Sequence, residues 1–167
     1  ATFFEDVKPS FLIQNEMYAG LKLKLPVGNT WVGAIEGNVF KLDDSYYQSD
    51  NFTNKDTADV TNFNGLSTNW SFAKNTLNRK QFASGGHLFS INARYVFGRE
   101  HAMPGSTSIN KNEIIKLHHW LNIGIDYQSF LIDEQNFHFG LHGQLVYNSQ
   151  SLFANYTSSL LAMTEFS

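Results

Sequence analysis

Residues 115–127 read IKLHHWLNIGIDY, and this stretch decides the fold. Its odd positions carry Ile, Leu, His, Leu, Ile, Ile and Tyr, whereas its even positions carry Lys, His, Trp, Asn, Gly and Asp. Successive side chains of a β-strand point to opposite faces of the sheet, so this alternation predicts a strand with one apolar and one polar face. The stretch is also longer than the ~5–6 residues of a common strand. A long strand with two such faces is typical of a closed barrel that crosses a bilayer.

The same period of two recurs along most of the chain. Clear segments span residues 17–25, 87–97, 137–148 and 152–166, a less regular one spans residues 31–40, and weaker ones span residues 3–13, 60–66 and 69–74. No segment has a convincing helical period. The 167 residues therefore predict one all-β domain, residues 1–167, built as an antiparallel up-and-down β-barrel of about eight to ten strands.

The connections between these segments differ in length. Residues 26–30, 133–136 and 148–151 form short turns, whereas residues 42–59, 75–86 and 99–112 are long and polar. Short turns that alternate with long loops suit a barrel whose two ends meet different compartments. Because loops on a rigid scaffold commonly carry recognition, we expect the loop of residues 42–59 to hold any surface-binding function.

The composition limits the classes of function. Charged residues make up 16% of the chain, against roughly 25% in a typical soluble domain, and aromatic residues make up 15%. The net charge of −3 gives no electrostatic reason for nucleic-acid binding. The chain has no cysteine, which excludes disulfides, zinc–thiolate sites and thiol nucleophiles.

The orientation of the two faces separates a membrane barrel from a soluble one. Glycines lie on the polar face at positions 20, 124 and 140, where a narrow lumen needs small residues beside large ones. Charges on this face are sparse and of both signs, as expected of a lumen in which they pair. We therefore predict that the polar face lines a lumen and the apolar face meets lipid. The candidate lumen cluster consists of Lys22, Glu36, Arg94, His118, Asp126 and His142.

In this pattern, rather than in any specific motif, the chain resembles small bacterial outer-membrane β-barrel proteins. The resemblance covers nearly the whole length. It implies a location in a Gram-negative outer membrane and membrane lipid as a partner, but the class includes adhesins, narrow channels, structural barrels and a few lipid-modifying enzymes. Our leading hypothesis is a non-enzymatic, porin-like role with a narrow polar path for small solutes or loops that bind a surface partner.

A soluble barrel is the alternative. It would be secreted or periplasmic, with the apolar face turned inward around an apolar ligand such as haem or lipid. His119 is the unusual member of the apolar stripe and would ligate the haem iron in that interpretation. Tyr95 and Phe139 would line the cavity beside it.

The histidines are the only notable reactive side chains. His118 and His119 are adjacent in a strand and point to opposite faces, and His138 and His142 lie ~13 Å apart along theirs, so neither pair predicts a metal site. His142 could meet His118 or Asp126 on the neighbouring strand, and hydrogen-bonded lumen histidines are the preferred interpretation over a metal or pH-sensing cluster. The His-x-Ser pair of the lipid A deacylases is absent, as are the common hydrolase and phosphate-binding motifs. We predict no catalytic residues, and an enzyme that modifies lipid without a familiar motif is a third alternative.

Overall fold

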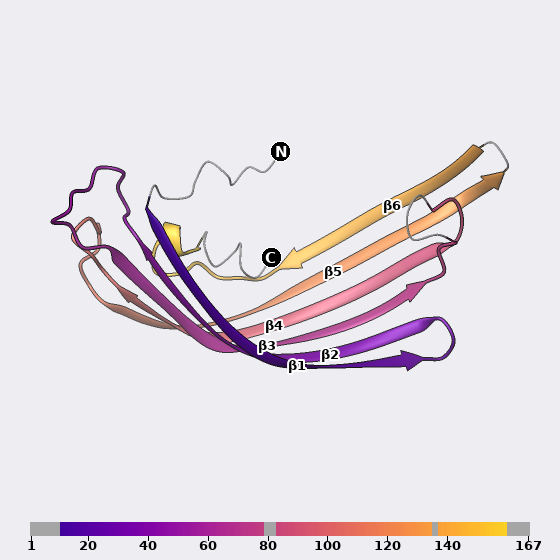
Figure 1. Ribbon diagram of the computed structural model, residues 1–167, viewed down its shortest axis with the longest axis horizontal. Helices are drawn as coiled ribbons and strands as arrows, with labels where there is room; N and C mark the ends of the chain where they lie inside the picture. Colours follow the sequence, from indigo (N-terminus) through magenta and orange to yellow (C-terminus); the bar gives the residue numbers. More distant parts are fainter. Residues whose placement is uncertain (1–10, 79–82, 135–136, 160–167) are drawn as a thin grey trace.

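The computed structural model describes residues 11–78, 83–134 and 137–159, which form one antiparallel sheet of six strands (Figure 1). The strands are β1 Leu12–Val27, β2 Trp31–Tyr46, β3 Asp59–Asn75, β4 His87–Met103, β5 Ile114–Glu134 and β6 Phe137–Asn148. They pair in chain order from β1 to β6, so the prediction of an all-β, antiparallel, up-and-down sheet is confirmed. The sheet is not closed, and β1 and β6 are its two edges.

Most strands are longer than the alternation predicts. β6 has the predicted bounds, whereas β2 and β4 run on into stretches that read as polar loops, to Tyr46 and Met103, and β5 extends into the predicted short turn, to Glu134. The two weak segments at residues 60–66 and 69–74 join into the single strand β3. Backbone pairing continues through Ser67 and Thr68, where the apolar alternation stops, because the hydrogen-bond ladder does not depend on side-chain polarity.

The predicted strand at residues 152–166 is wrong over its described part. Residues 156–159 form a short helix instead. Asn155 caps this helix, since its Oδ1 accepts a hydrogen bond of 2.8 Å from the backbone N–H of Ser158. Residues 160–166, and residues 3–10 of the other weak segment, lie outside the described residues.

The register aligns the apolar stripes of all six strands on one face. Leu23, Ile35, Trp70, Ala93, Ile123 and Tyr147 are successive partners from β1 to β6. One residue along each strand, the opposite face carries the polar row Lys22, Glu36, Asn69, Arg94, Asn122 and Asn148. Figure 1 shows that the sheet curves around the segment that follows β6. Phe153 of that segment contacts Phe63 and Trp120, so their face is the concave face and the apolar one is the convex face.

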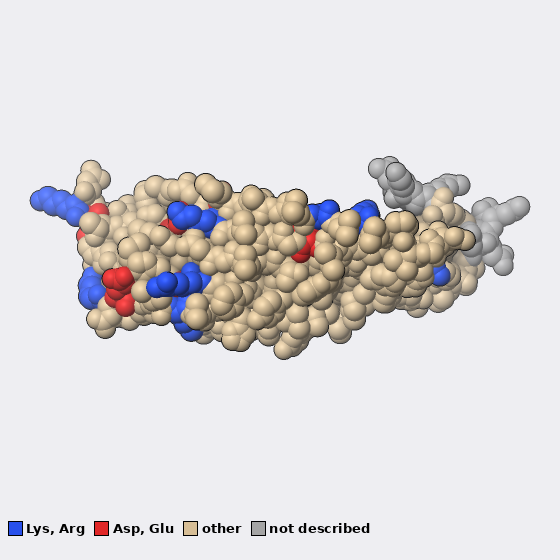
Figure 2. Space-filling view, turned by 90° about the horizontal axis from the view of Figure 1, so that it is seen from below, with Lys and Arg blue, Asp and Glu red and all other residues tan. Residues whose placement is uncertain are grey.

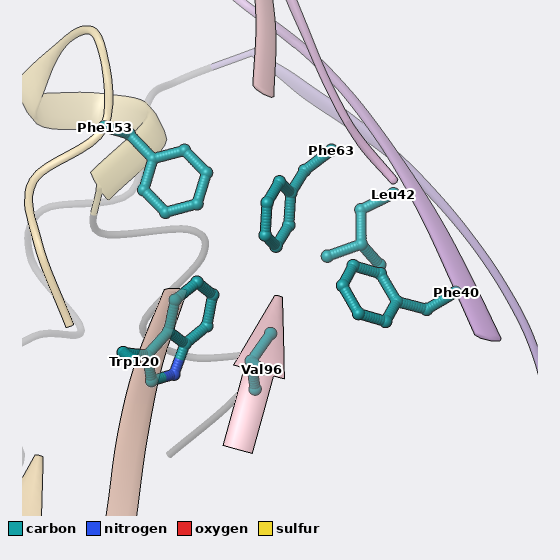
Figure 3. Packing of buried hydrophobic residues seen from close by; sticks show 6 residues of the cluster. All are labelled: Phe40, Leu42, Phe63, Val96, Trp120 and Phe153. Carbon is teal, nitrogen blue, oxygen red and sulfur yellow. The ribbon is translucent and has the colours of Figure 1, made fainter. Parts of the chain in front are cut away.

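A small apolar core lies on the concave face near the long loops (Figure 3). Its members are Phe40, Leu42, Phe63, Val96, Trp120 and Phe153. The Phe63 ring stacks on Trp120 at 5.7 Å between centroids and meets the Phe153 ring edge-on at 5.0 Å. Gly65 and Gly98, which are register partners, leave room for the rings of Phe40 and Phe63 over the backbone. The core thus needs glycine at the point where two strands and two rings approach closely.

We expect Gly65→Ala to lower the free energy of unfolding by about 1–3 kcal/mol, since overpacking forces backbone shifts. A Cβ at this position would overlap the carbonyl oxygen of Phe97, which the ladder holds in place. Gly37→Ala in β2 is the control, because a Cβ there meets nothing within 4 Å. Urea titration in detergent measures both, and equal midpoints for the two variants would contradict the packing described for Gly65.

Candidate functional site on the concave face

The predicted lumen residues all lie on the concave face, but at three levels along the strands. Lys22, Glu36 and Arg94 share the central polar row. On β5, His118 and Asp126 each lie four residues from that row, which is ~13 Å along the strand in opposite directions. The structure therefore distributes the six side chains along the face instead of gathering them into one cluster.

The central level is a hydrogen-bonded polar hollow. Lys22 Nζ lies 2.9 Å from Glu36 Oε2, and the amide of Asn38 donates to Glu36 Oε1 at 3.1 Å. A hollow of about 260 Å³ opens beside them. It is lined by Glu16, Tyr18, Glu36, Asn38, Phe40, Leu42, Ser67 and Arg94. Both signs of charge border it, which suits a small polar solute better than an apolar one.

The level nearer the short turns holds a second pair. His142 Nε2 lies 2.8 Å from Asp126 Oδ2, across the hairpin of β5 and β6. This is one of the two partners that the sequence allowed for His142. The His142 side chain is 58% exposed, so the pair borders open space on the concave face.

His118 belongs to a different, fully buried group near the long loops. Its Nε2 lies 2.6 Å from Glu100 Oε2, and both side chains have 0% exposure. The second nitrogen of the ring, Nδ1, lies 3.1 Å from the hydroxyl of Ser151. The other oxygen of Glu100 accepts a hydrogen bond of 2.9 Å from the backbone N–H of Ala154. This pair therefore fastens the segment after β6 to the sheet.

Further contacts keep residues 149–159 on the concave face. The Phe153 ring stacks on the His118 ring at 4.2 Å and 12°. Asn155 donates to the hydroxyl of Tyr46 at 2.6 Å, and Lys116 Nζ donates to the carbonyl of Leu152 at 2.9 Å. We call residues 149–159 the inner segment. It occupies the long-loop end of the concave face, at the level of His118.

We expect Glu100→Ala to lower the free energy of unfolding by about 3–5 kcal/mol, because it leaves the buried His118 without its partner. The inner segment should also exchange its amide hydrogens faster, since Ala154 loses its acceptor. Glu113→Ala is the matched control, since Glu113 pairs with His101 in an exposed position where the loss is less than about 1 kcal/mol. Unchanged hydrogen exchange over residues 149–159 in Glu100→Ala would contradict the anchoring role.

The two long loops contact each other at the same end of the sheet. These are the β2–β3 loop, residues 47–58, and the β4–β5 loop, residues 104–113, both shorter than predicted because β2 and β4 extend further. The backbone N–H of Ser106 donates to the carbonyl of Thr57 at 2.9 Å, and the Ser106 hydroxyl donates to Asp56 at 2.7 Å. Gly105 donates to the buried carboxylate of Asp59 at 2.7 Å. The loops therefore form a connected surface rather than independent arms.

The contact between these loops should weaken in acid, because one of its hydrogen bonds is accepted by the carboxylate of Asp56. The hydrogen bond from Ser106, with further bonds from Thr53, lowers the pKa of Asp56 below its ordinary value of 3.8. The ionised Asp56 carboxylate therefore contributes its full stabilisation of the folded chain above pH 3.8, and this contribution is lost as the pH falls through the lowered pKa. We expect the amide resonances of Ser106 and Thr57 to shift over that range. The shift should be absent in Asp56→Asn and present in Asp50→Asn, and a shift that persists in Asp56→Asn would contradict this assignment.

The residues of the soluble alternative lie on the convex face. His119 is the register partner of Phe97 on this face, and Tyr95 and Phe139 are 38% and 44% exposed. They border open surface on the curved sheet rather than its inner side. Across the described strands, no group of three or more His, Asp or Glu side chains is arranged to hold a metal.

The comparisons with family models, curated proteins and solved structures found no match to this chain. In the described residues, no helix has the length and apolar character needed to span a membrane.

Sequence reasoning missed Glu100, Ser151 and Phe153. Glu100 falls in a stretch that reads as a polar loop, and Phe153 falls in a stretch whose alternation predicts a strand. A buried carboxylate needs a buried partner. That the partner of Glu100 is His118 can be recognised only once the register of β4 and β5 is known. Nothing local indicated that residues 149–159 would turn back over the sheet.

Proposed function

We propose that this chain forms part of the wall of a transmembrane β-barrel in a Gram-negative outer membrane. Its concave polar face lines a narrow lumen for small polar solutes, and its role is non-enzymatic. The inner segment restricts that lumen at the long-loop end, and the connected loops at residues 47–58 and 104–113 provide the surface for any external partner. Closure into a barrel of eight to ten strands requires strands in addition to the six described.

The apolar band on the convex face carries this proposal. Large apolar side chains are exposed along it, including Leu21 at 86%, Leu117 at 62% and Leu145 at 61%. Figure 2 shows this face with charged residues gathered toward the long-loop end and a broad middle region almost without charge. Soluble proteins rarely expose an apolar patch larger than a few hundred Å². A surface of this kind needs an apolar environment.

The dimensions of the band fit a bilayer. On β1 it runs from Met17 to Val27, which is ~33 Å along the strand and ~25 Å along the membrane normal at a tilt of ~40°. This matches the ~25 Å apolar band of outer-membrane barrels.

Aromatic side chains border the band at the end with the β1–β2 turn. Trp31 stacks on Phe72 at 4.6 Å and meets Phe89 edge-on at 6.0 Å, and Lys74 lies 5.6 Å above the Trp31 ring. Aromatic rings with a neighbouring lysine are typical of the boundary between lipid and water.

The direct test is insertion. The purified chain should require detergent to stay in solution, and it should enter preformed phosphatidylcholine vesicles and resist added protease there. A monodisperse protein that stays soluble without detergent would contradict the proposal.

A pair of adjacent substitutions tests which face meets lipid. Ile91→Arg on the convex face should lower the free energy of unfolding in vesicles by about 1 kcal/mol, because it lies in the apolar band, beside Phe72 at its aromatic border. Ser90→Arg, the next residue of β4, points to the concave face opposite Asp126 and should be nearly neutral. Urea titration in vesicles measures both, and a larger loss for Ser90→Arg would reverse the assigned faces.

A further inference from the structure

The apolar band contains a groove that the register explains. Its volume is about 820 Å³, and it crosses β1 to β4 on the convex face. Its floor is at Gly37, where a Cβ would meet nothing within 4 Å, and Thr68 is its neighbour in the same row. Leu21 and Tyr95 close the two ends of that row, while Val39, Leu66 and Phe97 form one wall. Three strand spacings make the groove ~14 Å long.

Basic side chains stand beside this wall on the side of the long loops. Arg99 follows Phe97 at the next convex position of β4, and Lys41 follows Val39 in the same way on β2. Lys41, Asn64 and Arg99 are successive register partners, so the two cations lie ~10 Å apart. Lys41 also pairs with Asp43 at 2.8 Å. Arg99 is exposed, and within the described part of the chain its guanidinium makes no hydrogen bond or ion pair.

We propose that this groove is a lipid-binding site for an anionic, phosphate-bearing lipid of the leaflet on the long-loop side. One acyl chain lies over Gly37 between Leu21 and Tyr95, and the phosphate lies against Arg99 with Lys41 beside it. The inference rests on the proposed membrane function and adds a specific ligand to it. The choice of ligand follows from the position of the charges: in a zwitterionic lipid the headgroup ammonium offsets the charge that the phosphate brings to Arg99, whereas an anionic phosphate brings a net negative charge to the edge of the apolar band.

The test uses native mass spectrometry of the full chain in detergent micelles. The probes are phosphatidic acid and phosphatidylcholine with identical acyl chains, so they differ only in the headgroup. We expect phosphatidic acid to bind about fivefold more tightly than phosphatidylcholine. This is the gain in affinity that one additional favourable contact between a cation and an anionic lipid supplies. Arg99→Gln should remove this preference. Lys74→Gln, a lysine at the other end of the band, should leave it intact.

A second pair of variants tests the groove itself. Gly37→Leu fills it and should weaken the binding of both lipids at least tenfold. Gly143→Leu adds the same side chain on the convex face of β6, where a Cβ also meets nothing within 4 Å, and should bind as the unaltered chain does. Equal binding by the two leucine variants would overturn the proposal. A monomer–dimer ratio that changes in Gly37→Leu but not in Gly143→Leu would also overturn it, since the groove would then receive a second copy of the chain.

The outcomes separate this inference from the proposed function. A chain that does not insert into vesicles would contradict the membrane role itself. A chain that inserts but does not discriminate phosphatidic acid from phosphatidylcholine overturns only the lipid site.

Discussion

The structure depends on a register that keeps six stripes in phase. Because the side-chain period of a strand is two, a slip of one residue at any pair would move a whole apolar stripe to the polar face. Here the row from Leu23 to Tyr147 and the row from Lys22 to Asn148 stay separate across five consecutive pairings. Within the pairings of the described strands, the only irregularity is a bulge in β5 between Phe130 and Ile132, near the end of its pairing with β6. Every feature of the two faces follows from this alignment.

The concave face is divided into a dry half and a polar half. Near the long loops, the aromatic core and the inner segment bury Glu100 and His118 together, and their hydrogen bonds to Ala154 and Ser151 satisfy groups that would otherwise be costly to bury. Farther along, the pairs Lys22–Glu36 and Asp126–His142 remain partly exposed. A buried pair of this kind contributes more to the unique placement of the inner segment than to net stability.

The sequence could predict the class of the sheet and the face of each side chain, because both follow from local alternation. It predicted β6 with its observed bounds and placed Lys22, Glu36 and Arg94 on one face. It could not predict that these three share a row, since that depends on pairing offsets between strands, whereas the distance of His118 from Asp126 follows from their separation by eight positions on one strand. It also misread residues 152–159, where the cap at Asn155 and the contacts of Phe153 override an alternating pattern. Tertiary contacts of this type have no signature within a short window of sequence.

The two free edges constrain any membrane role more strongly than the faces do. Every second residue of β1 and of β6 directs its backbone N–H and C=O away from the sheet, and each such group left unsatisfied in hydrocarbon costs several kcal/mol. An open sheet therefore cannot be the membrane-embedded form, and further strands must pair with both edges. Because the meander has six strands, β1 and β6 run in opposite directions. Antiparallel closure between these edges is consequently possible only with an even number of additional strands. The smallest such additions are two and four strands, which would bring the proposed barrel to eight or ten strands in total.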